Sequence, residues 1–242
     1  YHAGNMVIVG AGKSEHNTFV EMVKKRFRKL PKGKTPKFEQ ARIASGGKLM
    51  TKEIEQLHLI LGYPAPGLHA PAKYSYPARV LAVLLGGNSS SRLFQKVREK
   101  RGLAYTVNSG MTAFSDAGIF QIYAGTDPAR AKELVTVIGQ ELRDVTQNIT
   151  ASELARAKEQ GRADLLMGQE NVMLRADVLG HQLLAFNRTI TTDRILKKLM
   201  SVNEDDVKMI ANKIFRRRPI VTALGPLGEL GSYRAVAERL AG

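Results

Sequence analysis

The sequence predicts an α+β fold in which a mixed, mostly antiparallel sheet packs against a layer of helices. Three observations lead to this prediction: strand-like segments and helices share the first half of the chain, a series of helices follows residue 127, and a last strand-like segment covers residues 220–224. A doubly wound parallel sheet would need regular alternation, which this order lacks. With 242 residues, 43% of them hydrophobic, the chain can bury a core, and we expect residues 1–242 to form one domain.

The first half of the chain contains apolar segments of different periodicity. Residues 6–10 are typical of a buried strand, and apolar side chains at helical spacing predict a helix over residues 15–30. A basic linker rich in glycine and proline covers residues 31–36. Alternating leucines and isoleucines predict a strand within residues 53–63, and the almost entirely apolar residues 74–85 predict a buried helix.

A third helix and a hairpin are predicted in the middle of the chain. The serines at positions 89 to 91 can cap a helix that runs to about residue 100, where Gly102 ends it. Residues 103–111 and 118–124 are typical of strands, and the short connection between them favours a hairpin.

Helices dominate the rest of the chain. Asp127 and Pro128, a capping side chain followed by a first-turn proline, begin a helix that runs to about residue 148. Thr150 and Glu153 have the spacing of a capping box, which opens a helical stretch to residue 186 with an interruption expected near Gly168. Two further helices are predicted, over residues 192–200 and 203–215.

The composition excludes some classes of site and leaves the compartment open. The chain contains no cysteine, so disulfides and thiolate metal sites are excluded. No apolar run approaches the roughly 18 to 20 residues of a membrane-spanning helix, so we expect an ordinary soluble protein without a transmembrane segment. A cysteine-free chain is compatible with the bacterial cytoplasm, the periplasm or the mitochondrial matrix.

The chain is strongly basic, with 37 lysines and arginines against 22 aspartates and glutamates and a formal net charge of +15. Much of the excess lies between Lys24 and Lys37, and a shorter cluster is Arg216-Arg217-Arg218. A solvated helix face with a basic loop is favoured over an anion-binding patch, because aromatic side chains for base stacking are few and scattered. The anion-binding alternative stays open, whereas nucleic-acid binding is not expected.

Three classes of catalytic or cofactor site lack their motifs. Val-Gly-Ala-Gly at residues 9–12 follows a strand-like segment, but Glu15 replaces the third glycine of a dinucleotide fingerprint and would repel a pyrophosphate. The five histidines include no pair three or four residues apart, so a zinc site on one helix face is not expected. The chain also has no cysteine nucleophile and no Gly-x-Ser-x-Gly elbow.

Residues 84–105 carry the most specific pattern in the chain, LLGGNSSSRLFQKVREKRGLAY. This segment resembles the C-terminal half of processing-peptidase-like members of the pitrilysin/insulinase family of zinc metallopeptidases. Shorter matching segments occur in the family's order, at residues 6–12, 55–58, 122–126, 153–158 and 224–225. The resemblance therefore runs almost from end to end.

The resemblance implies an αβ roll, the metallopeptidase half-domain that occurs twice in a full-length member. It also implies that the zinc motif His-x-x-Glu-His lies on an N-terminal half or a partner subunit, so that zinc binds there and this C-terminal domain holds no cofactor. The implied partners are that catalytic half, a peptide substrate, and a second subunit in a homo- or heterodimer. This chain would close the chamber that holds the peptide.

Arg98 is the first candidate site residue. On a helix with about 100° per residue, Arg98 lies close in direction to Phe94 and borders the stripe formed with Leu93 and Val97. Its guanidinium group would therefore be held in place by the neighbouring side chains.

Tyr105 is the second candidate, because it shares a strand face with Leu103 and Val107, so that its ring can pack while its hydroxyl reaches outward. The resemblance implies an arginine and a tyrosine seven positions apart that project towards the zinc site, and Arg98 and Tyr105 match this spacing. Such donors can orient a peptide and stabilise the oxyanion of its hydrolysis. The alternative is a surface ion pair for Arg98 and a packed core position for Tyr105.

Three functions remain to be distinguished. The favoured one is the non-zinc-binding half of a zinc metalloendopeptidase, inactive alone because the zinc motif is absent. The second is a catalytically inactive scaffold or partner subunit of the same family, and the third is a basic anion-binding module that uses Lys24 to Lys37. An intact His-x-x-Glu-His motif elsewhere in the protein favours the first, a degenerate motif the second, and steeply salt-dependent binding of nucleic acid or acidic lipid the third.

Overall fold

The computed structural model describes residues 2–34 and 38–241. Two compact units make up the chain, one formed by Tyr1–Gln40 with Arg162–Lys197 and the other by Ala41–Gly161 with Lys198–Gly242. The second and larger unit contains the sheet and most of the buried residues. That residues 1–242 act as one C-terminal domain stays a prediction.

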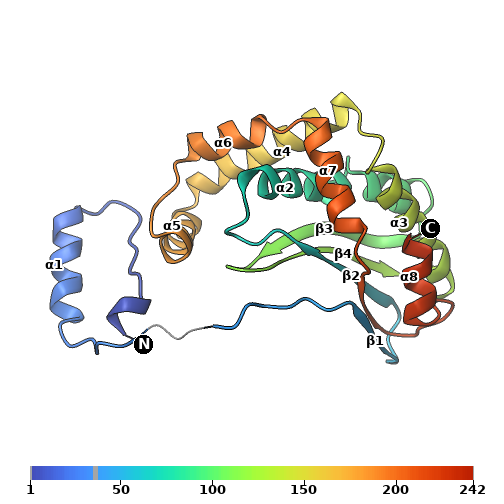
Figure 1. Ribbon diagram of the computed structural model, residues 1–242, viewed down its shortest axis with the longest axis horizontal. Coiled ribbons are helices and arrows are strands. Elements are labelled where there is room, and N and C mark those ends of the chain that lie inside the picture. The colour runs from blue at the N-terminus through green and yellow to red at the C-terminus, as the bar shows by residue number, and fades with distance from the viewer. Residues whose placement is uncertain (1, 35–37, 242) are drawn as a thin grey trace. The chain divides into compact units, whose positions relative to one another are not determined.

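A five-stranded sheet organises the larger unit (Figure 1). Its strands lie in the order β1-β5-β2-β4-β3; β1 and β5 are parallel, and the other neighbours are antiparallel. The strands are β1 (Gly46–Met50), β2 (Leu57–Ala65), β3 (Ala104–Ala113), β4 (Gly118–Thr126) and β5 (Ile220–Leu224). This confirms the predicted α+β fold, its mixed, mostly antiparallel sheet and the β3–β4 hairpin.

Helices cover one face of this sheet (Figure 1). Helix α2 packs on β3 and on α7, α7 contacts β2, and α8 packs on α3 and β1. Their bounds are α2 (Ala72–Gly86), α3 (Ala131–Asp144), α7 (Glu204–Phe215) and α8 (Tyr233–Ala241). The other face carries exposed side chains, among them Ile60, Asn108 and Gln121.

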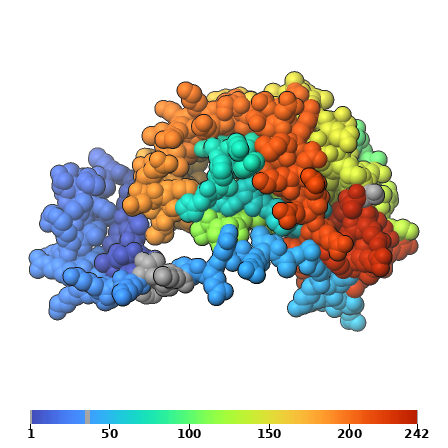
Figure 2. All heavy atoms as spheres, in the orientation of Figure 1, coloured from blue at the N-terminus to red at the C-terminus, as the bar shows by residue number. Residues whose placement is uncertain are grey.

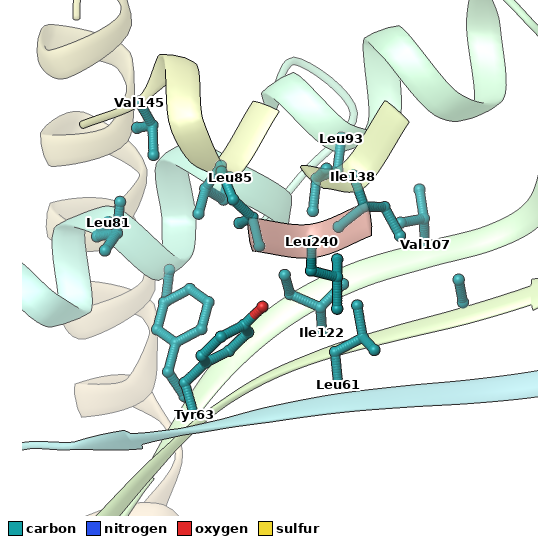
Figure 3. Close-up of a cluster of buried hydrophobic side chains, with 14 of the residues drawn as sticks. Leu61, Tyr63, Leu81, Leu85, Leu93, Val107, Ile122, Ile138, Val145 and Leu240 are labelled. Carbon is teal, nitrogen blue, oxygen red and sulfur yellow. The ribbon is translucent and has the colours of Figure 1, made fainter. Parts of the chain in front are cut away.

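The core lies between the sheet and these helices. Along β2, Leu57, Leu59, Leu61 and Tyr63 are almost fully buried while the intervening Ile60 is 43% exposed, as strand alternation requires. Figure 3 shows Leu61 and Tyr63 beneath the helical residues that cover them. Burial of this alternating set on one side gives the sheet its register.

Local capping chemistry defines the helices that follow the hairpin. Asp127 accepts a hydrogen bond from the Ala129 N–H at the start of the 3-10 turn η3 (Pro128–Arg130), which precedes α3. The Glu153 N–H donates to Thr150 Oγ1 at 3.3 Å and the Thr150 N–H donates to Glu153 Oε2 at 3.0 Å, which confirms the capping box.

The predicted helical stretch to residue 186 consists of two helices. They are α4 (Ala151–Glu170) and α5 (Val172–Phe186). The break falls at Asn171, whose side chain caps α5 by accepting from the Leu174 N–H at 3.0 Å, rather than at Gly168. The remaining helices are η1 (Ala3–Asn5), α1 (His16–Arg26) and α6 (Thr192–Met200).

The predicted strand over residues 6–10 is wrong. No strand is assigned there, and Val7 and Ile8 are each 37% exposed. Strand hydrogen bonds need a neighbour, and the described residues provide none for this segment. The predicted helix at 15–30 is present but shorter, as α1. Lys37, the last residue of the basic segment that begins at Lys24, lies outside the described residues, as do residues 35 and 36 of the linker.

Three elements were not predicted: the short 3-10 helix η1, the strand β1 and the helix α8. Strand β1 contains the Gly46-Gly47 pair, which has low strand propensity, and it forms because β5, from the far end of the chain, pairs with it.

Among the described residues no helix is long and apolar enough to cross a membrane.

Candidate functional site

The segment that carries the predicted site is anchored at its start by Arg92. This side chain is only 8% exposed and donates from Nε and Nη2 to the two carboxylate oxygens of Glu153, at 2.9 and 3.0 Å. Its Nη1 donates to Asp144 Oδ2 at 2.8 Å, and Nη2 also donates to the Asn148 carbonyl. Arg92 thus connects the segment to the end of α3 and the start of α4.

Two further contacts hold the end of the segment, where it enters β3. Arg130 donates from Nη1 to the Gly102 carbonyl at 2.8 Å and from Nη2 to the Arg101 carbonyl at 3.0 Å. Gly102 has a φ of 56°, a left-handed conformation that favours glycine in this turn. Thr126 of β4 donates to the Leu103 carbonyl. The backbone on both sides of the turn is therefore fixed by side chains from other elements.

Arg98 lies between these anchors on a π-helical turn, η2 (Phe94–Glu99), where the sequence predicts an α-helix. The Lys100 N–H bonds to the Gln95 carbonyl, five residues back, and turns of this kind are frequent at functional sites. The Arg98 guanidinium lies 4.8 Å from the Phe94 ring centre, as the helical spacing predicts, and its Nε is 3.9 Å from Glu99 Oε1. The Phe94 ring orients the guanidinium group, and Arg98 remains accessible because 47% of its side chain is exposed.

Tyr105 is placed differently from the prediction. The β3–β4 register shifts between Ala104 and Thr106, which leaves Tyr105 as the extra residue of a β-bulge. Tyr105 is 71% exposed, while Leu103 and Val107 are buried. The prediction that its ring packs on a face shared with these two residues is wrong, because the bulge interrupts the alternation of the strand.

The sheet brings together a histidine and a tyrosine that sequence reasoning did not pair. His58 Nδ1 lies 2.8 Å from the Tyr123 hydroxyl, and the two rings stack with centroids 6.0 Å apart. Both residues are partly buried, His58 in β2 and Tyr123 in β4. The signal that relates them is the β2–β4 register, which a single sequence does not reveal.

Two glutamates near the Arg92 anchor have pKa values displaced in opposite directions. Burial raises the pKa of Glu153, but hydrogen bonds from Arg92 and Thr150 outweigh it, so the pKa lies below its ordinary value. Burial raises the pKa of Glu141, and the Lys96 and Arg92 charges only partly offset that effect. Lys96 Nζ lies 3.9 Å from the Glu141 carboxylate.

The described residues do not fit a zinc site. Within residues 2–34 and 38–241 there is no group of three or more histidine, aspartate or glutamate side chains placed to hold a metal ion. A zinc site of the catalytic type needs three protein ligands, and the described residues bring no such set together. What the segment does present is two exposed hydrogen-bond donors on an anchored backbone.

Comparison with known families identifies the chain. Residues 1–160 match the family described as the peptidase M16 inactive domain. The chain belongs to the M16 peptidase family. This membership confirms the family resemblance drawn from residues 84–105.

Relatives of this M16 chain are longer proteins. It is 34% identical to an uncharacterized zinc protease of Rickettsia felis, over 93% of this chain and 55% of the relative. A zinc protease of Streptomyces coelicolor is 34% identical over 97% of this chain and 53% of the relative, and one of Bacillus subtilis is 31% identical over 96% and 57%. The chain thus spans about half the length of the curated relatives it matches.

A solved structure shows the same fold. A chain of Complex III2 from Candida albicans, Inz-5 bound, superposes with a TM-score of 0.86 at 20% identity, over 95% of this chain and 57% of that chain. At this identity the comparison establishes the fold of the M16 chain and nothing further.

Proposed function

We propose that this chain is the non-zinc-binding half of a zinc metalloendopeptidase and that Arg98 and Tyr105 bind the peptide carbonyl during hydrolysis. The observation that carries the proposal is the combination of accessibility and anchoring. Tyr105 is 71% exposed and the Arg98 side chain 47% exposed, while Arg92, Arg130 and Thr126 fix the backbone between and around them. Exposed donors on a fixed backbone are what a preorganised oxyanion site requires.

The chemistry assigned to this chain is hydrogen bonding and charge stabilisation. A tetrahedral intermediate places negative charge on the former carbonyl oxygen, which the Arg98 guanidinium and the Tyr105 phenol can stabilise by donating to it. Zinc, supplied by the other half of the protein, would polarise the peptide bond. The partner of this chain is accordingly the metal-bearing half or subunit, and the peptide lies between the two.

Kinetics of the complete protein test the proposal. In the protein that contains both halves, Arg98→Ala and Tyr105→Phe should each lower kcat by about 100-fold, the effect of removing one oxyanion donor in other hydrolases. Arg79→Ala is the control, since Arg79 is an exposed arginine of α2 outside the segment, and it should leave kcat unchanged.

The alternative of a catalytically inactive scaffold predicts a different result. If the complete protein holds no zinc and cleaves no peptide, the scaffold function replaces the proposal. If it is active and neither Arg98→Ala nor Tyr105→Phe changes kcat, the protease assignment survives and the role of the two donors is wrong.

A further inference from the structure

A cavity of about 600 Å³ in the larger unit lies away from the segment described above. It is lined by the end of α7, by the loop that joins α7 to β5, and by α8. In Figure 2 these parts of the chain, coloured orange to red, adjoin one another on the surface in view. The volume is within the range of small-molecule sites.

Cationic side chains predominate around this cavity. Arg216, Arg217, Arg218 and Arg234 line it, and among the described lining residues Glu238 alone carries a carboxylate. Glu238 pairs with Arg234 at 2.8 Å. Within the described part of the chain, no carboxylate forms an ion pair with the three arginines of the loop. All three are exposed, so water and salt screen their mutual repulsion, and an anion that binds among them would interact with three positive charges.

A buried phenol also lines the cavity. Tyr63 is only 2% exposed, and no hydrogen bond to its hydroxyl is present among the residues that the structure describes. In Figure 3 its hydroxyl oxygen is directed towards Leu240, another lining residue. Although the residue as a whole is buried, its hydroxyl oxygen is not sealed from solvent, so a ligand in the cavity can accept its hydrogen bond. Burial also raises the pKa of Tyr63, so the phenol keeps its proton and remains a donor.

Aromatic and aliphatic groups form the rest of the wall. The Phe215 ring packs edge-on against Tyr63, with centroids 5.2 Å apart, and Leu240 is buried beside the cavity. The Tyr233 hydroxyl donates to the Pro219 carbonyl at 3.0 Å and so ties α8 to the arginine loop. The loop is therefore fixed next to an apolar surface.

We propose that this cavity binds a small phosphate monoester that carries an apolar or aromatic group. The phosphate oxygens would accept from the Tyr63 hydroxyl and from the guanidinium groups of Arg217 and Arg218, and the organic group would cover Phe215 and Leu240. The proposal shares no residue with the peptide-binding proposal and stands or fails independently of it.

Calorimetric titration of the full chain with phenyl phosphate and with inorganic phosphate tests the site. Phenyl phosphate should bind saturably and about tenfold more tightly than inorganic phosphate, because its ring buries apolar area on Phe215. Tyr63→Phe should weaken binding by about tenfold with little effect on thermal stability, since no protein group among the described residues bonds to the hydroxyl that it deletes. Arg217→Gln with Arg218→Gln should weaken it by at least about tenfold.

A matched variant separates site binding from general attraction to a basic protein. Lys197→Gln with Lys198→Gln removes the same charge from exposed positions of α6 and should leave the affinity unchanged. Equal weakening by both paired variants, no saturable binding at about 10 mM ligand, or equal affinity for the two phosphates would overturn the proposal. Sedimentation with phosphatidic acid vesicles, using the same variants, then distinguishes a lipid-borne phosphate from a free one.

Discussion

Arg92 is a buried cation shared by two carboxylates of other elements. Replacing it with alanine leaves Glu153 and Asp144 without their partner at a partly buried position. Because an unpaired interior charge is costly, Arg92→Ala should lower the free energy of unfolding by roughly 3 kcal/mol. Urea denaturation at pH 7 measures the change.

A surface arginine gives the comparison for this measurement. Arg79→Ala, at an exposed position of α2, should change the free energy of unfolding by less than about 0.5 kcal/mol. If Arg92→Ala were equally mild, Arg92 would not be the anchor of the segment that carries Arg98.

Glu153 should make the stability of the protein depend on pH. Its pKa in the folded state is lowered from 4.5, because hydrogen bonds from Arg92 and Thr150 outweigh burial. The folded state therefore favours the charged form, and the stabilisation is present above the unfolded pKa and lost as pH falls through the folded pKa. Glu153→Gln should destabilise the protein at pH 7 by roughly 1.5 to 3 kcal/mol, and less at pH 3.

Denaturation of wild type and Glu153→Gln at both pH values supplies the test. A stability difference that stays the same from pH 7 to pH 3 would contradict the assigned pKa displacement. Asp193→Asn, an exposed acid in the first turn of α6 with no role in the anchor, controls for the general effect of removing a negative charge.

At the scale of elements, the sequence predicted those features of the fold that depend on residues close together in the chain. The β3–β4 hairpin, the Thr150 capping box and the buried helix α2 depend on residues close in sequence, and the structure confirms all three. Strand β1 depends on pairing with β5, which lies far along the chain, so its own residues carry little signal.

In the candidate site, too, features that depend on neighbouring residues could be predicted, and features that depend on strand pairing could not. Helical spacing correctly predicted that Arg98 lies beside Phe94. Alternation failed for Tyr105, because one extra residue in the bulge alters which side chains face the core. The His58–Tyr123 pair depends on the register of β2 and β4, so neither segment alone indicates that the two side chains meet.

The contact between α2 and β3 gives a prediction at this scale. A methyl group at Gly86 would meet the backbone nitrogen of Ser109, whose hydroxyl already donates to the Ala82 carbonyl at 2.8 Å. Backbone atoms of a paired strand cannot easily move, so Gly86→Ala should destabilise the protein by about 1 to 3 kcal/mol. Thermal or urea denaturation measures this.

Gly110 is the matched control. It lies in β3 next to Ser109, and a methyl group there meets no atom within 4 Å. Gly110→Ala should be neutral or slightly stabilising, because it restricts the unfolded chain. Equal effects of the two substitutions would show that strand or helix propensity, rather than close packing of α2 on β3, sets the cost at Gly86.

At the scale of the whole molecule, this M16 chain presents donors and lacks a metal site among its described residues. The proposed function predicts that the chain alone binds no stoichiometric zinc and hydrolyses no peptide, and that the complete protein binds zinc in its other half. Elemental analysis of both preparations after dialysis checks this. One zinc ion per isolated chain, retained at high salt, would contradict the division of roles.

The most direct test of the proposed function compares a transition-state analogue with a substrate in the complete protein. A phosphonate peptide mimics the tetrahedral intermediate, and a donor that acts on the oxyanion favours it over the ground state. Arg98→Ala and Tyr105→Phe should each weaken phosphonate inhibition by about 100-fold while KM changes by only a few fold. Equal loss of affinity for analogue and substrate, or no loss for either, would contradict the role of the two donors.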